Sequence, residues 1–388
     1  MKPKTSDQKP TTKNQQPKID FANLQYQYQL YKTEIDKAIQ KVLDKSNYIM
    51  GNEVSELERA LEAFTGASHA ITCSSGTDAL LLAMMALEIQ PGDEIITTPF
   101  SFIATAETIA FLGAIPVFVD IDEDTYNIDP NKIEAAITQK TKAILPVSIF
   151  GQPADLDAIQ EIIDQQLKTK NQKLHLIIDG AQSFGATYKG KTDSNLGDIA
   201  TTSFFPAKPL GCFGDGGAVF TNNEILASKI RSLRVHGQSK RYHHKYIGMG
   251  GRMDTIQATV LNIKLKHYKK DLRLRQEVAK KYDEILSQKP EAKNRQLKLP
   301  IVNDSCTSTW AQYSVRVKNR DETQASLKEK GIPTAVHYPI PLHLQECFNY
   351  LGYKQGTFPI AEIVCNEILS LPINPYLSNT EIEYICNF

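Results

Sequence analysis

The chain has 388 residues, 41% of them hydrophobic and 23% charged, a composition typical of a globular protein with a sizeable core. At roughly 150 residues per domain, this length predicts two or three domains, and α/β proteins favour the lower number. Lys plus Arg and Asp plus Glu both number 44, so the net charge is zero. This balance argues against a nucleic-acid binder, which needs a concentrated basic face. No apolar run approaches ~18 residues, so we expect no transmembrane helix.

Two further features concern location and order. The six cysteines form no CxxC pair and no dense framework, so we expect reduced thiols in a cytoplasmic protein. Residues 1–18 contain five lysines, one aspartate and almost no apolar side chain, so we expect a disordered tail, with a binding arm as the alternative. The tail has no apolar segment of the kind that a signal peptide needs.

The hydrophobic pattern predicts helices and strands in alternation. In chain order we expect helices at 31–45 and 54–64, a strand at 70–72, a helix at 78–87, a strand at 94–97, a helix at 104–112, a strand at 115–119, a helix at 132–137, a strand at 143–148, a helix at 156–165, a strand at 175–178, a long helix at 262–282, a strand at 312–317, a helix at 321–330 and a strand at 334–337. Such alternation predicts an α/β fold with a mainly parallel sheet covered on both faces. We expect a large domain over residues 19–255 and a small C-terminal α+β domain over 256–388.

An aspartate follows one of the apolar strands. Asp179 ends the run LIID, which places a carboxylate at the C-terminal edge of the parallel sheet, where open α/β sheets bind ligands. The alternative is an aspartate that caps the next turn.

A lysine lies in a glycine-rich segment. Lys208, in SFFPAKPLGCFGDGGAVF, precedes glycines 211, 214, 216 and 217, whose small size lets backbone approach closely and suits an amine directed into a cleft. By itself a lysine is more often a solvated surface residue.

Hydroxyl side chains and a glycine begin a helix at TCSSGTDALL. Ser74, Ser75, Gly76 and Thr77 exceed what an ordinary helix cap needs, and the free amides of a helix N-terminus bind phosphate well. Phe100 and Phe102 follow the strand at 94–97, either as core residues or as a flat platform for a ring.

Together these parts match the needs of pyridoxal 5′-phosphate (PLP). Its aldehyde forms a Schiff base with a lysine, and a carboxylate keeps its pyridine nitrogen protonated. An aromatic side chain can stack on the ring, and a helix terminus can hold the phosphate. We therefore expect a PLP enzyme.

The same segments resemble a known family. SSGTDAL, TPFSFIATAET, DGAQSFGA, SFFPAKPLGCFGDGGAVFTN and GGRMDTIQA are similar, in this order, to the DegT/DnrJ/EryC1/StrS sugar aminotransferases. The resemblance runs from about Ile19 to the C-terminus, and the SFFPAK…GDGGA block is highly specific. It implies the type I, aspartate aminotransferase-like fold and a homodimer with sites at the subunit interface.

The resemblance also implies roles for individual residues. Lys208 is the expected Schiff-base lysine, and Asp179 the expected partner of the pyridinium. Gln182 is expected at the ring or its 3-hydroxyl group and Phe102 in the stacking position. The residues expected around the phosphate are Gly76, Thr77 and Ser203.

The GGRMD block both matches and departs from the family. Arg252 is expected to reach the nucleotide sugar of the partner subunit. Two residues earlier the family usually has an asparagine that contacts the phosphate across the dimer, but this chain has Gly250, so other donors must serve. Relatives with histidine in place of the lysine are dehydratases, so Lys208 favours transamination.

The expected substrate follows from two further segments. RVHGQSKRYHHKYIG and TAVHYPIPLH resemble the subgroup that aminates C3 of UDP-2-acetamido-2-deoxy-3-oxo-D-glucuronate for lipopolysaccharide and O-antigen synthesis, with glutamate as the expected donor. His337 and Tyr338 are expected to face the sugar nucleotide.

Other functions stay open at this point. An aminotransferase for a 4-keto sugar or a dTDP-linked 3-keto 6-deoxy sugar would share the cofactor residues, and a PLP-binding regulator would lack turnover. A non-enzymatic scaffold would have no need of Lys208 beside four glycines. We expect no metal site, because the adjacent side chains of His243 and His244 rarely converge on one ion and no Cys or carboxylate cluster accompanies them.

Overall fold

The computed structural model describes residues 17–294 and 296–387, so residues 1–16 of the predicted tail lie outside it. The helices are α1 (Leu24–Lys45), α2 (Asn52–Thr65), α3 (Gly76–Ala86), α4 (Ala104–Phe111), α5 (Ile133–Ala136), α6 (Leu156–Lys170), α7 (Glu224–Leu233), α8 (Thr255–Leu286), α9 (Pro290–Lys293), α10 (Arg320–Glu329), α11 (Pro359–Glu367) and α12 (Asn379–Ile385). The strands are β1 (His69–Cys73), β2 (Glu94–Thr97), β3 (Ile115–Phe118), β4 (Thr141–Ile144), β5 (His175–Asp179), β6 (Thr187–Tyr188), β7 (Lys191–Thr192), β8 (Ile199–Ser203), β9 (Gly217–Thr221), β10 (Gln238–Lys240), β11 (His243–His244), β12 (Leu297–Lys298), β13 (Cys306–Thr307), β14 (Tyr313–Val317) and β15 (Ile368–Leu371).

A seven-stranded sheet forms the centre of the molecule, in the order β1-β9-β8-β5-β4-β2-β3. From β8 to β3 each neighbouring pair is parallel, whereas β9 is antiparallel to both β8 and β1. The prediction of an α/β fold with a mainly parallel sheet is therefore confirmed. Gly217 of β9 lies opposite both Cys73 and Ser203, which aligns the ends of β1 and β8.

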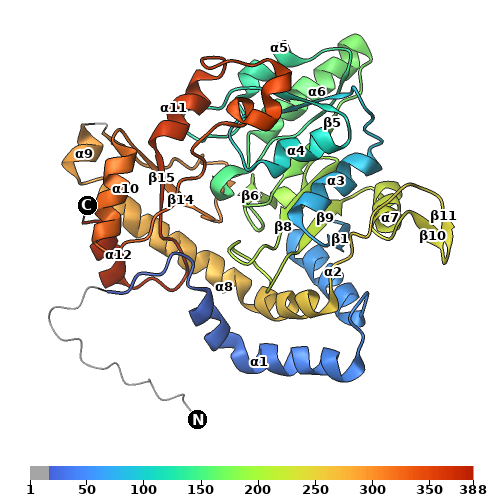
Figure 1. The fold of residues 1–388 in the computed structure, drawn as a ribbon, viewed down its shortest axis with the longest axis horizontal. Helices are drawn as coiled ribbons and strands as arrows, with labels where there is room; N and C mark the ends of the chain where they lie inside the picture. The colour runs from blue at the N-terminus through green and yellow to red at the C-terminus, as the bar shows by residue number, and fades with distance from the viewer. Residues whose placement is uncertain (1–16, 295, 388) are drawn as a thin grey trace.

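Consecutive strand residues enter different cores, because side chains alternate between the two faces of a sheet. Ile178 of β5 packs in a core with Leu57 of α2 and Leu261 of α8. Its neighbour Ile177 packs in a second core with helices α3, α4 and α7. Both sides of the sheet are thus covered by helices, as the uniformly apolar strands predict. Figure 1 shows α3 and α7 on one side and the long α8 crossing below the sheet.

The C-terminal part has its own small sheet and core. Strands β12, β14 and β15 form a three-stranded antiparallel sheet. Its core contains Tyr282 of α8, Val315 of β14 and Ile382 of α12. Since α8 also contributes Leu261 to the core of the large sheet, this one helix serves both parts. The boundary at residues 255 and 256 stays a prediction.

Two predicted strands are wrong in extent or kind. The strand expected at residues 143–148 is β4 at Thr141–Ile144, and it ends before Pro146, which has no amide hydrogen to donate. The strand expected at 334–337 is only an isolated bridge in which Ala335 and Ser370 exchange backbone hydrogen bonds. Prolines 333 and 339 on either side limit its extension.

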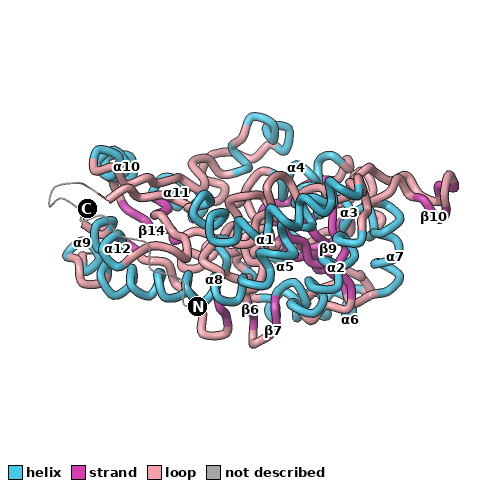
Figure 2. The backbone as a smooth tube through the Cα atoms, turned by 90° about the horizontal axis from the view of Figure 1, so that it is seen from below, coloured by secondary structure: helices cyan, strands magenta, loops and turns pink. Residues whose placement is uncertain are grey.

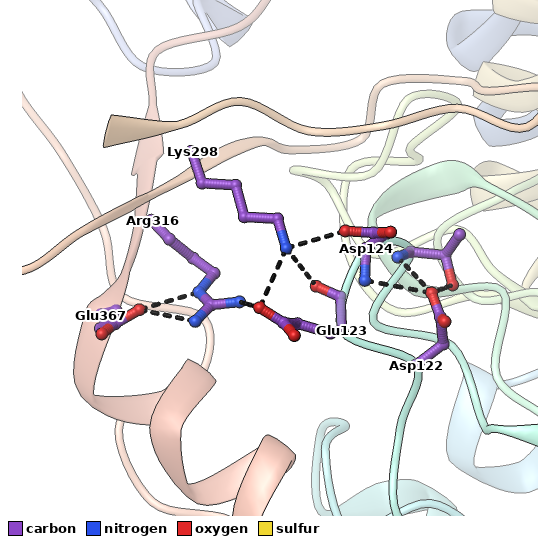
Figure 3. Close-up of polar contacts among 7 residues, drawn as sticks. Asp122, Glu123, Asp124, Lys298, Arg316 and Glu367 are labelled. Atoms are coloured by element: carbon purple, nitrogen blue, oxygen red, sulfur yellow. Dashed lines mark hydrogen bonds and ion pairs between the residues drawn. The ribbon is translucent and has the colours of Figure 1, made fainter. Parts of the chain in front are cut away.

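A chain of ion pairs links the two parts of the molecule (Figure 3). Arg316 of β14 donates from Nε to Glu367 of α11 at 2.9 Å, and its Nη1 lies 3.4 Å from Oε1 of Glu123. Lys298 of β12 lies 3.2 Å from the same Glu123 oxygen and 2.8 Å from Asp124. Glu123 and Asp124 follow β3 of the large sheet, so the network joins that sheet to the small one.

The molecule is long in the view of Figure 2, with the β10 hairpin projecting at one end and α9, α10 and α12 gathered at the other. Among the described residues, no helix combines the length and apolar character that crossing a membrane requires.

Candidate active site

One edge of the large sheet gathers most of the predicted site residues. Asp179 is the last residue of β5, Ser203 the last of β8, and Gly76 opens α3 directly after β1. Because these strands run parallel to one another, their carboxyl ends lie at one edge. Asp179, which the sequence places at a strand end, therefore lies together with Gly76, which it places at a helix start, and with Ser203, which the family resemblance implies.

The Asp179 carboxylate is buried and held by two donors. The Thr105 hydroxyl donates to Oδ2 at 2.8 Å, and the Ala181 amide donates to Oδ1 at 3.1 Å. Burial raises the pKa of Asp179, while these two donors and the charge of Lys208 oppose that rise. Among the described residues, Lys208 is the one cation whose charge acts on it, and it forms no ion pair with Asp179 at contact distance. The carboxylate could therefore accept a further cationic donor.

Lys208 follows β8 in the glycine-rich loop and is half-buried. Its amide donates to the Phe205 carbonyl at 2.9 Å, which turns the chain back at the strand end. Burial lowers the pKa of Lys208 to about 8, and the charge of Asp179 acts in the opposite direction. A lysine with this pKa holds a useful fraction of neutral, nucleophilic amine near neutral pH.

The start of α3 packs directly on Ser203. A Cβ atom on Gly76 would lie 2.7 Å from the Ser203 Cβ, so only glycine permits this approach. Ser75 caps the helix by accepting from the Asp78 amide at 3.0 Å, and the Ser74 hydroxyl bonds to the Asp78 carboxylate. The hydroxyls of Ser74 and Ser75 are thus both engaged in hydrogen bonds to Asp78 at the N-terminus of α3. The Thr77 hydroxyl and the first helical amides are the groups that could hold an anion.

Aromatic and amide side chains adjoin this edge. The buried Gln182 accepts from the Phe150 amide at 2.6 Å and donates to the Tyr338 hydroxyl at 3.1 Å. The Phe102 ring is 56% exposed, and its centroid lies 6.2 Å from that of Tyr338. So large an exposed fraction does not suit a core residue and leaves a ring face open to a ligand.

His337 is neutral near physiological pH. Its Nδ1 lies 2.8 Å from the Ser370 hydroxyl, and burial together with the charge of Lys208 lowers its pKa to about 4. The adjacent residue Tyr338 accepts from Gln182, which places His337 near the residues of this sheet edge.

Comparisons with known proteins match this geometry. Residues 29–388 match the model of the DegT/DnrJ/EryC1/StrS aminotransferase family. The chain belongs to this family. It is 48% identical to the UDP-2-acetamido-2-deoxy-3-oxo-D-glucuronate aminotransferase of Pseudomonas aeruginosa, over 95% of this chain and 98% of that protein.

Solved aminotransferases share the fold. The structure of S. venezuelae DesV in complex with a ketimine intermediate superposes with a TM-score of 0.91 at 37% identity, over 96% of this chain and 97% of DesV. NtdA from Bacillus subtilis, solved with bound cofactor PMP, gives a TM-score of 0.87 at 28% identity, over 97% and 85% of the two chains. The predicted type I fold and the prediction of a PLP-dependent aminotransferase are confirmed.

The residues of this family member fit PLP. The buried Asp179 carboxylate has two neutral donors and no contacting cation, which is the deficit that a protonated pyridine nitrogen would meet. The Phe102 face is open, and the end of α3 offers amides for a phosphate. The residues that could hold the cofactor are Gly76, Thr77, Phe102, Asp179, Gln182, Ser203 and Lys208.

Arg252 of this aminotransferase follows Gly251, whose carbonyl accepts from the Ser74 amide at 3.1 Å just before the start of α3. It is half-buried and makes no hydrogen bond or ion pair with Asp179, Gln182 or Lys208 within the described chain. A Cβ atom on Gly250 would lie 3.1 Å from Cε1 of His236 and 3.6 Å from Nη2 of Arg252. The imidazole of His236 therefore fills the space into which a family asparagine would project.

Sequence reasoning missed residues that support the site. Thr105 bonds to Asp179, and the Thr309 hydroxyl donates to the Gln182 carbonyl at 2.7 Å. Thr105 lies in the segment TPFSFIATAET and is the second residue of α4, so a polar residue in an apolar helix was the available signal. Thr309 lies 127 residues from Gln182 and has no local signal.

Proposed function

We propose that this aminotransferase converts the C3 ketone of UDP-2-acetamido-2-deoxy-3-oxo-D-glucuronate to an amine, with glutamate as the amino donor, in lipopolysaccharide or O-antigen sugar synthesis. The observation that carries the choice of substrate is the 48% identity to the P. aeruginosa enzyme across nearly the whole of both chains. The chemistry rests on Lys208 and Asp179 at one sheet edge, which every aminotransferase alternative would share.

Lys208 is the proposed catalytic base and acid. When bound, PLP supplies an aldehyde that exchanges amines and a ring that withdraws electrons from the adjacent carbon. The Lys208 amine, with its pKa lowered to about 8, removes a proton from the α-carbon of the amino donor. In the second half of the reaction the same group gives a proton to C3 of the sugar. Its place after β8, in a loop closed by backbone hydrogen bonds, keeps that amine near the Asp179 edge.

Asp179 and the residues around it are proposed to hold and orient the cofactor. We assign Asp179 to the pyridine nitrogen, because a buried carboxylate favours a proton on the group that it faces. Phe102 would cover one face of the ring, and the Gln182 amide, which also donates to Tyr338, would donate to the ring oxygen. Gly76, Thr77 and Ser203 would hold the phosphate, and Gly76 and Ser203 are in contact at the start of α3.

The nucleotide sugar is assigned to Arg252, His337 and Tyr338. Tyr338 contacts Gln182, and His337 precedes it in the chain, so a neutral imidazole and a phenol near this edge can bind sugar hydroxyls. Arg252 carries the positive charge that a diphosphate or the sugar carboxylate needs. We propose, from the family resemblance, that Arg252 serves the site of a second subunit.

We also propose a cytoplasmic homodimer. Tyr48, Ile49 and Met50 are 45%, 51% and 43% exposed and follow one another beside the start of α8, and Ile247 is 92% exposed. Such apolar exposure favours a protein interface. The six cysteines are unpaired, as expected in a reducing compartment.

The deciding experiment compares substrates. Purified protein is supplied with glutamate and, in turn, the UDP-linked 3-oxo-glucuronate, the matching 3-oxo sugar without the carboxylate, and a 4-keto sugar, and the aminated carbon is located by NMR. We expect the highest kcat/KM for the 3-oxo-glucuronate. Faster amination of a 4-keto sugar overturns the substrate assignment, and bound cofactor without turnover on any of them points to the regulator.

A further inference from the structure

The loop that carries Lys208 is a closed structure. The Phe204 amide donates to the Gly216 carbonyl at 2.7 Å, and the Cys212 amide donates to the Phe204 carbonyl at 2.8 Å. A Cβ atom on Gly211 would lie 2.5 Å from the Pro206 carbonyl oxygen, so the two arms of the loop touch. The direction of Lys208, between these arms, therefore depends on where the Gly211 arm is held.

Helix α8 holds that arm with two side chains on one face. Gln257 accepts from the Phe213 amide at 2.8 Å. Lys264, seven residues or about two turns later, donates from Nζ to the Gly211 carbonyl at 2.7 Å. The same Nζ lies 4.8 Å from the centroid of the Phe213 ring. Both contacts of Lys264 thus fall on the arm that follows Lys208.

A lysine at position 264 carries a desolvation cost. It is 4% exposed, and no carboxylate of the described chain lies within ion-pair distance of it. Burial lowers its pKa to about 8, against weaker opposing effects of Cys212 and Asp271. Its ammonium is compensated by one carbonyl dipole and one aromatic face. An apolar side chain of similar size would avoid this desolvation cost, so fold stability alone does not account for a lysine here.

We propose that Lys264 is a positioning residue for Lys208: by fixing the Gly211 carbonyl and the Phe213 ring, it sets the direction and the burial of the Lys208 amine. This inference rests on the role proposed above for Lys208. It adds a second lysine that acts only through the loop and touches neither cofactor nor substrate.

The test compares Lys264→Met with Lys264→Arg and with the control Lys266→Met, an exposed lysine on the same helix. In cofactor-free protein, the rate at which an amine-reactive reagent labels Lys208 is followed against pH by mass spectrometry. We expect the wild-type midpoint to move upward in Lys264→Met, because a displaced loop exposes the Lys208 amine to water. Lys264→Arg, which keeps the donor and the charge, should restore most of the wild-type profile, and Lys266→Met should equal it.

The holoenzyme gives a second readout. In Lys264→Met we expect kcat to fall about 10- to 100-fold while KM for glutamate changes less than about twofold, since a misdirected amine slows the proton transfer and not binding. A labelling profile and a kcat equal to those of wild type in a folded Lys264→Met variant overturn the proposal.

Two further outcomes are decisive. If Lys264→Met does not fold, Phe213→Leu replaces it, because the 42% exposed ring can be removed with little loss of core. A smaller shift of the Lys208 profile in the same direction supports the proposal, and no shift overturns it. If wild type aminates no 3-oxo sugar, the proposed substrate fails, whereas the labelling comparison still decides the role of Lys264.

Discussion

Two groups of buried charged residues in this molecule differ in whether the chain supplies an oppositely charged partner. Arg316, buried at the junction of the two sheets, contacts the carboxylates of Glu367 and Glu123, and Glu123 in turn contacts Lys298. Asp179, buried at the edge of the large sheet, has a hydroxyl and an amide but no contacting cation among the described residues.

The difference separates structural charges from functional ones. Where the chain itself supplies the opposite charge, the residues hold parts of the fold together. At Asp179, where burial raises the pKa and no cation of the described chain is in contact, the site is prepared for a ligand that brings the missing charge. Substitutions in the first group should therefore change stability, and those in the second should change activity.

Removal of the amine is the most severe change at the sheet edge. We expect Lys208→Ala to lower kcat by at least about 10²–10⁴-fold, because it removes the proposed proton carrier. The visible band near ~410–420 nm, typical of a lysine-bound cofactor, should disappear, and the melting temperature should stay close to that of wild type. The exposed Lys270→Ala is the control, and a band that persists in Lys208→Ala contradicts the assignment.

Replacing the Asp179 carboxylate by a neutral amide tests whether its negative charge is needed for turnover. Asp179→Asn should slow turnover by about 10²–10³-fold, as expected when a preorganised electrostatic contact is lost, and should leave cofactor retention largely intact. Thr105→Val removes one donor to the same carboxylate and should cost about tenfold, equivalent to one hydrogen bond to a charged group. Steady-state kinetics decide, and a wild-type rate in Asp179→Asn rules out its role at the ring nitrogen.

Substitutions in the ion-pair network of Arg316 should change the stability of the fold. Arg316→Met leaves Glu367 without its cation and should lower the free energy of unfolding by about 1–3 kcal/mol. Lys298→Met removes a more exposed cation of the same network and should cost at most about 1 kcal/mol. Denaturant unfolding measures both, with kcat of the folded fraction unchanged. An Arg316 variant with wild-type stability and reduced kcat would erase the distinction between the two groups.

The smallest effect is a shift in titration. In cofactor-free protein the labelling of Lys208 should rise through a pH of about 8 and not through its usual 10.5, because burial favours the neutral amine. In Asp179→Asn the midpoint should fall further, since the carboxylate that favours the ammonium form is gone. A midpoint near 10.5 in wild type would show that the amine is solvated.

Local sequence patterns predicted the sheet edge well, for a physical reason. Asp179 ends a predicted strand and Gly76 lies at the start of a predicted helix, and parallel strands bring their ends together whatever the details of packing. Ser203, at the end of β8, is instead implied by the family resemblance. The bonds that tune these residues join distant parts of the chain: Thr105 is 74 residues from Asp179, and Lys264 is 53 from Gly211. Such pairs depend on how helices pack, which hydrophobic periodicity does not specify. The strand predicted at 334–337 is wrong for another reason, because Pro333 and Pro339 limit its pairing to the bridge between Ala335 and Ser370.

The antiparallel strand β9 constrains the order in which the protein acquires its shape during synthesis. Strand β1 pairs with β9 alone, so residues 69–73 have no partner in the sheet until residue 221 has left the ribosome. Pairing over such a separation is slow, and an unpaired apolar strand is exposed to aggregation meanwhile. Because Gly217 joins β1 and β8 in one step, the start of α3 and the loop that carries Lys208 are brought together only then. A nascent chain that stops before β9 should therefore have neither a closed sheet nor a cofactor site.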